Sequence, residues 1–346
     1  MTDKFNNIKD CMKPFFKSVP PFVREKIIYP YVTYYTMPLI VSKPKVLVLE
    51  LSNLCNLNCK MCTRPFKEAP IGVMPLSLAK EAIRRAHDAG IARLAFHTVG
   101  EPLLYPYLKE VLTYAKDLGF QIGISANANL LTSQKSDMLL DIGLNNLRIS
   151  LDGTGEIYNF IRERGNFSCV VKNIEYINKR RPNDITPRIK CNYVLTRDSI
   201  KCVTDFQKKY AYLFNEVTFC PVINQGYVKN EYVQKRSIIL FNNYSYPCFN
   251  LWSNMYIAFD GDVSVCCVDY NHKHIVGNIE KDSLLNIWNS PSYQYYRKLS
   301  REGKINKMEF CKNCTMPVLI SAYQMSRIGA LIRRTHSLNI KILNKY

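Results

Sequence analysis

Three cysteines, Cys55, Cys59 and Cys62, lie within eight residues, directly after the largely apolar run Leu49–Leu54. Three thiolates are one fewer than the closed set of four that a structural zinc ion takes. A four-iron cluster held by three cysteines keeps one iron open to a small molecule. The count and the spacing therefore favour an iron-sulfur cluster that binds a ligand. Three buried thiols, or part of a zinc site, are the alternatives.

The spacing C-x3-C-x2-C on a loop after a first strand resembles the signature of the radical SAM superfamily. The resemblance implies that Cys55, Cys59 and Cys62 hold a [4Fe-4S] cluster whose open iron binds S-adenosylmethionine. One electron would then cleave that molecule to a 5′-deoxyadenosyl radical, which takes a hydrogen atom from an unactivated carbon. A flavodoxin- or ferredoxin-type electron donor is the partner that this chemistry implies.

The elements that must position these cysteines follow from the periodicity of the sequence. From Val46 onward, apolar strand-like runs alternate with amphipathic stretches, which is typical of parallel βα units. Six such units are too few for an eight-stranded barrel and match the open (β/α)6 barrel expected of the family, with the active site at the carboxyl ends of the strands. The predicted strands are Val46–Leu51, Ala92–His97, Phe120–Ser125, Asn146–Leu151, Arg188–Val194 and Glu216–Cys220, and the predicted helices are Ser77–Ala89, Tyr107–Leu118, Ser133–Ile142, Cys169–Arg180 and Ser199–Phe214.

Two motifs follow the second and third predicted strands. The stretch from His97 to Leu104 resembles the family's GGEP motif, although Val99 replaces the first glycine. The resemblance implies that Gly100 and Glu101 bind the methionine ammonium of the cofactor. The stretch from Ser125 to Leu131 is similar to the family's T-N-G-x-L-L run but lacks the glycine, so we predict no contact there.

A further motif follows the fourth predicted strand. Ser150-Leu151-Asp152-Gly153, with Arg162 downstream, resembles the S-L-D-G…R run of the peptide- and sugar-modifying branch of the superfamily. The resemblance implies that Ser150 and Arg162 hold the carboxylate of the cofactor, a task that suits a planar guanidinium. Arg162 could instead be an ordinary helix-surface charge, and Asp152 is interpreted as a turn former rather than as a base.

A second cysteine set lies in the C-terminal third. Cys248, Gly261, Cys266, Cys311 and Cys314 follow the pattern C-x12-G-x4-C…C-x2-C, which resembles the opening of the SPASM signature. No cysteine follows Cys314, so the set also resembles the related twitch domain, which implies one auxiliary [4Fe-4S] cluster, as in an alcohol dehydrogenase of an aminoglycoside pathway. A structural zinc site on the same thiolates is the alternative. We predict a small α+β domain with a hairpin, Met255–Phe259 and Asp262–Cys266, and a helix, Ser283–Asn289.

Cys267, next to Cys266, has three open roles: the actual cluster ligand, a buried thiol, or a hydrogen-atom donor to a substrate radical. The last role would mean epimerisation. Relatives with a SPASM domain use an acid just after this ligand as a base, and Asp269 is the nearest carboxylate here, offset by two positions. His272 and His274 could bind a metal ion, but we interpret them as solvated loop residues.

Charge and length set the cellular context. The 346 residues carry a formal net charge of +19, with eight Lys or Arg against three acids in 1–45 and five against none in 317–346. Cysteines spaced for iron must stay reduced, which favours the cytoplasm. The uncharged run Ile27–Ser42 is shorter than the roughly 20 residues of a membrane span. Both ends either pack on the fold or make weak contact with an anionic membrane, which would place the protein at the membrane periphery.

We expect five segments and an enzyme. The segments are a basic apolar N-terminal arm (1–45), the radical SAM partial barrel (46–222), a polar bridge (223–246), a twitch- or SPASM-like domain (247–316) and a basic C-terminal helix (317–346). The expected substrate is a sugar, aminocyclitol or related polyol or glycan, free or linked to phosphate or lipid, which is oxidised or epimerised. A maturase of ribosomal peptides and a non-catalytic electron-transfer protein are the alternatives, and nucleic acid is not an expected partner.

Overall fold

Nine strands form one curved sheet within the residues that the computed structural model describes, which are 38–314 except 67, 183–185, 223–229, 239–247, 249, 268, 309–310 and 312–313. The order along the sheet is β6-β5-β4-β3-β2-β1-β7-β8-β9. Every pair from β6 to β7 is parallel, and the pairs β7–β8 and β8–β9 are antiparallel. The strands are β1 (Val46–Leu49), β2 (Arg93–Phe96), β3 (Gln121–Ala126), β4 (Asn146–Ser150), β5 (Arg188–Leu195), β6 (Glu216–Pro221), β7 (Asn254–Ile257), β8 (Asp262–Ser264) and β9 (Ile275–Asn278).

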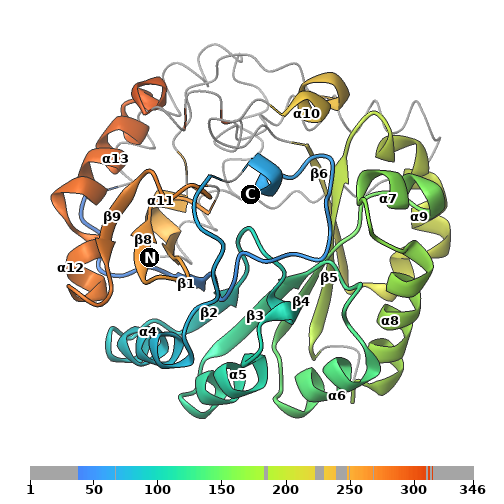
Figure 1. Ribbon diagram of the computed structural model, residues 1–346, viewed down its shortest axis with the longest axis horizontal. Coiled ribbons are helices and arrows are strands. Elements are labelled where there is room, and N and C mark those ends of the chain that lie inside the picture. The colour runs from blue at the N-terminus through green and yellow to red at the C-terminus, as the bar shows by residue number, and fades with distance from the viewer. Residues whose placement is uncertain are drawn as a thin grey trace, which may run out of the picture.

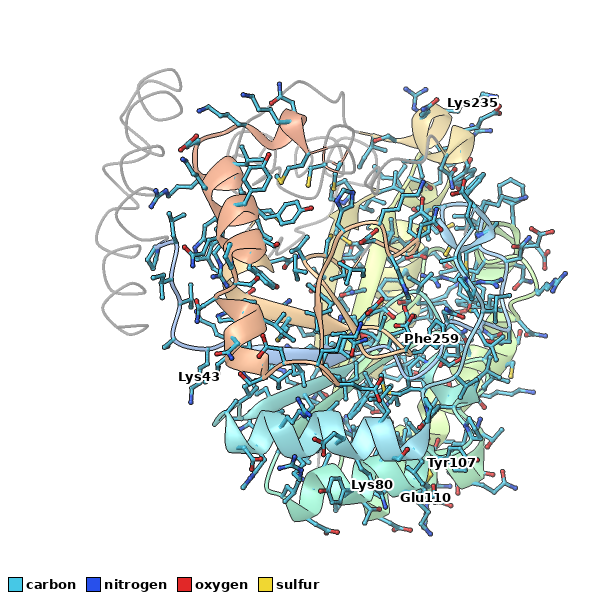
Figure 2. All side chains as sticks on the ribbon, turned by 60° about the vertical axis from the view of Figure 1, so that its left-hand side comes forward. Lys43, Lys80, Tyr107, Glu110, Lys235 and Phe259 are labelled. Carbon is cyan, nitrogen blue, oxygen red and sulfur yellow. The ribbon has the colours of Figure 1, made fainter. Side chains whose placement is uncertain are left out.

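Helices cover the convex side of this sheet, and its concave side faces the middle of the molecule (Figure 1). Lys80, Tyr107 and Glu110 mark the outer surface of this helical layer (Figure 2). The helices of the barrel are α4 (Leu76–Asp88), α5 (Leu108–Asp117), α6 (Ser133–Asp141), α7 (Gly155–Ile161), α8 (Phe167–Arg180) and α9 (Val203–Lys209), and later come α10 (Glu231–Arg236), α11 (Asn250–Ser253), α12 (Leu284–Trp288) and α13 (Pro291–Arg301). Short 3-10 turns are η2 (Arg64–Phe66), η3 (Pro102–Leu104), η4 (Ser199–Cys202), η5 (Ala211–Leu213) and η6 (Ile305–Lys307).

Side chains alternate between the two faces of each strand, as extended backbone requires. On β3, Ile122 and Ile124 are buried in the core with the helices, whereas Gly123 and Ser125 point to the concave side. The strands β2, β4 and β5 show the same alternation. One face of the sheet therefore builds the core, and the other is left for a site.

The second cysteine region continues the sheet of the barrel. β7 pairs in parallel with β1, with Leu49 opposite Ile257, and the Glu50 N–H donates to the Ile257 carbonyl at 2.9 Å. Gly261 closes the β7–β8 turn at a φ of 85°, a conformation that glycine adopts without strain. Both cysteine sets are therefore attached to neighbouring strands of one sheet.

A buried arginine ties this region to the start of the described chain. Arg297, on α13, has no exposed surface, and it donates to the carbonyls of Leu251 at 3.0 Å and Leu39 at 2.9 Å. Its guanidinium lies 4.3 Å from the Trp288 ring and 4.6 Å from the Tyr293 ring, which is cation–π geometry. Burial lowers the pKa of Arg297 to about 10.

The predicted partial barrel with a small α+β extension is confirmed. All six predicted barrel strands and the predicted hairpin are present, each within two residues of its predicted ends. The predicted helix Ser199–Phe214 is wrong, because this stretch forms η4, α9 and η5 in succession. The sequence also gave no sign of α7, of α13 or of the pairing of β7 with β1.

Several predictions fall outside the described residues. The N-terminal arm before residue 38, the C-terminal helix 317–346 and most of the bridge 223–246 belong to this group, although α10 lies in the bridge. Over the part of the chain that is described, no helix is both long and apolar enough to cross a bilayer.

Candidate active site at the carboxyl edge of the sheet

The segment that carries Cys55, Cys59 and Cys62, called the cysteine loop below, leaves the end of β1 and crosses the concave side of the sheet (Figure 1). Within the loop, the Leu57 N–H donates to Cys55 Sγ at 3.5 Å, and the Arg64 N–H donates to Cys62 Sγ at 3.4 Å. Burial raises the pKa of all three cysteine thiols. A bound cationic centre would therefore have to stabilise their thiolates, as coordinated metals do.

Side chains from the next strands reach the same sulfur atoms. Asn127, after β3, places its Nδ2 4.0 Å from Cys55 Sγ, and Arg162 places Nη1 3.7 Å from Cys59 Sγ. In the described part of the chain no three His, Cys, Asp or Glu side chains are close enough to hold a single metal ion. Three separated thiols that receive N–H donors fit the donor set of an iron-sulfur cluster, whose sulfurs accept such bonds.

The predicted GGEP-like turn lies directly against the cysteine loop. A Cβ on Gly100 would stand 2.1 Å from the Ser52 carbonyl oxygen, so only glycine fits there. Glu101 is buried, and its carboxylate accepts the N–H groups of Leu103 at 3.2 Å and Asn127 at 2.8 Å. Burial raises the pKa of Glu101 to about 7, against the lowering effect of these bonds. Glu101 therefore links the turn after β2 to the end of β3.

Arg162 is buried rather than a helix-surface charge. Its Nε donates to Asp152 Oδ2 at 2.7 Å, and Asp152 Oδ1 accepts the Val194 N–H at 2.7 Å. Burial opposes the charge of Arg162, but Asp152 and Cys59 outweigh it and raise the pKa of Arg162. The interpretation of Asp152 as a simple turn former is wrong, because it positions the guanidinium beside Cys59. Ser150, the other predicted carboxylate ligand, is half-buried at the end of β4.

The run after β3 packs on the cysteine loop. Asn127 is buried and donates to Asn56 Oδ1 at 2.9 Å, a contact within the protein that leaves the absence of a cofactor contact there a prediction. Ala128 stands where the family's motif has glycine, and it adopts a φ of 61°. Alanine therefore occupies a left-handed conformation that glycine would adopt without strain.

Five cysteines converge in the second region. Burial and the nearby charge of Cys314 raise the pKa of both Cys248 and Cys311. The Cys267 side chain forms hydrogen bonds with Cys266 and with the Tyr256 hydroxyl. Burial raises the pKa of the Cys248 thiol to about 12. The four predicted ligands and Cys267 therefore share one buried place beside β7 and β8, which fits a second cluster.

The comparison with protein families decides the class of protein. Residues 49–199 match the model described as the radical SAM superfamily. The chain belongs to the radical SAM superfamily. Residues 248–315 match a second model, SPASM, described as an iron-sulfur cluster-binding domain. This radical SAM enzyme therefore uses a [4Fe-4S] cluster with S-adenosylmethionine, and its C-terminal domain carries auxiliary iron-sulfur binding.

Curated relatives and solved structures agree with the fold. The tungsten-containing aldehyde ferredoxin oxidoreductase cofactor-modifying protein of Pyrococcus furiosus is 23% identical over 308 residues, covering 74% of this chain and 84% of that protein. The AdoMet-dependent heme synthase of Methanosarcina barkeri is 30% identical over 141 residues, only 40% of its own length. BtrN in complex with AdoMet and 2-DOIA has a TM-score of 0.54 at 18% identity, covering 80% of this chain and 94% of BtrN. Streptococcus suis SuiB bound to precursor peptide SuiA has a TM-score of 0.61 at 19% identity, covering 75% and 67%.

Asp269 organises the loop after the cysteines of this radical SAM protein. Its carboxylate accepts the Ser264 hydroxyl at 3.1 Å and the N–H groups of Lys273 at 3.1 Å and His274 at 2.8 Å. His274 in turn lies 3.0 Å from the Tyr296 hydroxyl through Nδ1. Asp269 thus already has three donors from its own loop, and we assign it to holding that loop.

A second acid was missed by the sequence reasoning. Glu50, after β1, is buried; its Oε2 accepts the Thr98 hydroxyl at 2.7 Å, and its Oε1 lies 3.9 Å from His272 Nε2. His272 Nδ1 lies 3.6 Å from Asp260 Oδ2, in the β7–β8 turn beside Phe259 (Figure 2). The interpretation of His272 as a solvated residue is wrong, because only 12% of its side chain is exposed. The sequence signal was an acid inside an otherwise apolar run.

Glu50 also lines a small hollow at the ends of β1 and β2, with room for about one water molecule. Ser52, His97, Thr98 and Gly100 share this lining. The three groups Glu50, His272 and Asp260 therefore form a path from the hollow to a turn where the Asp260 side chain is 40% exposed. The distances from His272 to Glu50 (3.9 Å) and to Asp260 (3.6 Å) are longer than a hydrogen bond. A proton would therefore pass along this path after a small movement of the side chains or through a bridging water molecule.

Proposed function

We propose that this radical SAM enzyme oxidises a hydroxyl-bearing carbon of a sugar, aminocyclitol or related polyol. Cys55, Cys59 and Cys62 would hold the cluster that binds S-adenosylmethionine, and Cys248, Cys266, Cys311 and Cys314 would hold the auxiliary cluster. Gly100 and Glu101 would meet the ammonium of the cofactor, and Ser150 and Arg162 its carboxylate. When bound, the cluster and S-adenosylmethionine together supply a 5′-deoxyadenosyl radical that removes one hydrogen atom from carbon.

The observation that carries the proposal is the Glu50–His272–Asp260 group, which runs from a buried carboxylate to an exposed one. Oxidation of an alcohol to a ketone removes a hydrogen atom from carbon, then a proton from oxygen and one more electron. An auxiliary iron-sulfur cluster held by the second cysteine set would accept the electron, and the Glu50 carboxylate would accept the proton. His272 and Asp260 then connect Glu50 to solvent, so that the carboxylate can be reset.

Cys267 defines the alternative outcome at the same carbon. If the Cys267 thiol returns a hydrogen atom to the substrate radical, the product is an epimer and no net oxidation occurs. We favour oxidation because Cys267 is engaged with Cys266 and Tyr256 and because Asp269, the predicted base, is held by its own loop. BtrN, whose fold is similar, binds 2-DOIA together with AdoMet.

The test is an anaerobic assay with reconstituted enzyme, S-adenosylmethionine, a reductant and a panel of sugars and aminocyclitols, each free and phosphorylated. We expect 5′-deoxyadenosine, transfer of substrate deuterium into it, and a product two mass units lighter. A product whose mass is unchanged in ordinary water and one unit heavier in D2O, from unlabelled substrate, would establish epimerisation instead. Iron analysis should give about eight irons for two four-iron clusters, and about four irons with one zinc would contradict the auxiliary cluster.

Changing Glu50 to Gln tests the proton path. We expect the yield of oxidised product per 5′-deoxyadenosine to fall about 100-fold, because an amide cannot accept the proton. Glu110→Gln, on the solvent side of α5, is the matched control and should keep the wild-type ratio. An unchanged ratio in Glu50→Gln would remove Glu50 from the mechanism.

A further inference from the structure

Strand register places polar side chains at two levels on the concave face of the barrel. At the deeper level Ser125 on β3 is opposite Arg148 on β4, Arg148 is opposite Lys190 on β5, and Lys190 is opposite Glu216 on β6. One step toward the carboxyl edge, Asn192 is opposite both Ser150 and Thr218. The residues between them along each strand are apolar and belong to the core on the other face. The concave face of four adjacent strands is therefore polar.

Most of these side chains have no partner in the part of the chain that the structure describes. Among the described residues, the side chains of Ser125, Arg148, Asn192 and Thr218 make no hydrogen bond and no ion pair, although Ser125, Asn192 and Thr218 are half-buried. These side chains are not fully buried, so solvent can reach them and they are not engaged by the described protein groups. A ligand that displaces water from this face would therefore meet several free donors and acceptors side by side.

The charges on this face leave one guanidinium uncompensated at the centre. Glu216 is neutralised by Lys190 at 3.1 Å and Arg188 at 3.0 Å, and Glu50 is bound by Thr98 and faces His272. Within the described ranges, Arg148 has no such carboxylate. Its charge acts on His97 on one side and on Cys220 on the other, which directs it across the concave face between β2 and β6.

His97 contributes no charge to this arrangement. Burial, and then the charge of Arg148, lower the pKa of His97 to about 4, so the imidazole is neutral near pH 7. Asp152, the remaining acid close to Cys220, is bound to Arg162. An anionic group that enters the barrel would therefore meet a net positive charge and a set of neutral hydrogen-bonding side chains.

We propose that Arg148 anchors an oxyanion of the substrate, a phosphate or a carboxylate, while Ser125, Asn192 and Thr218 bind its hydroxyl groups. The inference rests on the proposed function, since it narrows the polyol to one that carries an anionic group. A guanidinium is suited to this because its planar fork pairs with two oxygen atoms of phosphate or carboxylate. The high net charge of +19 is consistent with attraction of an anionic substrate.

The experiment measures binding of three probes that share a three-carbon frame: glycerol 3-phosphate, glycerate and glycerol. Equilibrium dialysis with radiolabelled probes uses the reconstituted holoenzyme in the presence of S-adenosylmethionine at low ionic strength. We expect at least one anion to bind about 10-fold or more tightly than glycerol, and the preferred anion identifies phosphate or carboxylate. Arg148→Gln should weaken that anion about 10-fold or more, Arg148→Lys should weaken it less, and Arg84→Gln, on the solvent side of α4, should leave it unchanged.

Two results would overturn the subsite: anions that bind no better than glycerol, or Arg148→Gln protein that binds them as the wild type does. Iron content and circular dichroism check that Arg148→Gln has folded, and if it has not, the comparison of Arg148→Lys with wild type decides. Wild-type enzyme that forms 5′-deoxyadenosine yet binds neither anion would refute the subsite and leave the radical chemistry standing. Anion binding through Arg148 without oxidation of any polyol would refute the polyol assignment instead.

Discussion

Ala128 carries a local strain that a single substitution should relieve. Its φ of 61° costs a residue with a Cβ about 1 kcal/mol relative to glycine. We expect Ala128→Gly to raise the free energy of unfolding by about that amount, measured from urea midpoints. Ala126→Gly, two residues earlier in the extended backbone of β3, is the control and should lower it. Equal destabilisation by both changes would show that the methyl group of Ala128 contributes more by packing than its conformation costs.

His97 should make the protein sensitive to mild acid. Its folded-state pKa of about 4 lies below the ordinary value of 6.5, because of burial first and Arg148 second. Below pH 6.5 the unfolded chain binds a proton that the folded chain rejects, so stability falls as the pH falls from 6.5 toward 4. Between pH 6.5 and 5 we expect wild type to lose about 2 kcal/mol more than His97→Gln.

Urea midpoints at several pH values measure this difference. His87→Gln, on the exposed side of α4, is the control and should keep the wild-type dependence on pH. Parallel pH profiles for wild type and His97→Gln would mean that His97 protonates freely in the folded protein.

Single residues could be predicted where a short sequence motif defines the site. They could not be predicted where only the folding of the chain brings the residues together. Cys55, Cys59 and Cys62 could be named from their spacing alone. The partner of Arg162, by contrast, is set by the way the turn after β4 folds back, and the three members of the Glu50–His272–Asp260 group are more than 200 residues apart at the extremes. No local pattern could have joined them.

At the scale of elements, the turn after β2 can pack against the cysteine loop only because Gly100 has no side chain. A methyl group on Gly100 would collide with the Ser52 carbonyl, which is backbone and cannot rotate away. We expect Gly100→Ala to displace the loop and to remove about half of the iron, about four of eight atoms. The measurement is iron content with S-adenosylmethionine binding. Gly123→Ala on β3, where a Cβ would be 3.6 Å from its nearest neighbour, should keep both.

Elements themselves were predicted well because their signals are periodic. Strands of this barrel are apolar on one face and are followed by amphipathic helices, and the hairpin has an Asp-Gly turn. The stretch Ser199–Phe214 shows the limit, since its apolar positions suit a continuous helix, but the chain forms tight 3-10 turns at both ends around α9. Such tightening depends on what the ends pack against, here Phe214 on Phe206.

At the scale of the whole molecule, Arg297 joins parts that are distant in sequence. Arg297→Ala would remove three hydrogen bonds, to the carbonyls of Leu251 and Leu39 and to Asn289 Oδ1, and two ring contacts. We expect a loss of about 3 kcal/mol in the free energy of unfolding. Urea midpoints measure it, with Arg297→Met as the comparison that keeps the apolar stem and lacks the charge. A loss below 1 kcal/mol in Arg297→Ala would show that the aromatic pair and α13 hold the region without it.

The pairing of β7 with β1 has a consequence for how this enzyme can be divided. β1 is an apolar strand, and without β7 its backbone N–H and C=O groups would form an open edge on that side. Open apolar edges recruit other chains and aggregate. The iron-sulfur extension is therefore not a detachable module, and a catalytic fragment that ends after β6 would be an aggregating protein rather than a smaller enzyme.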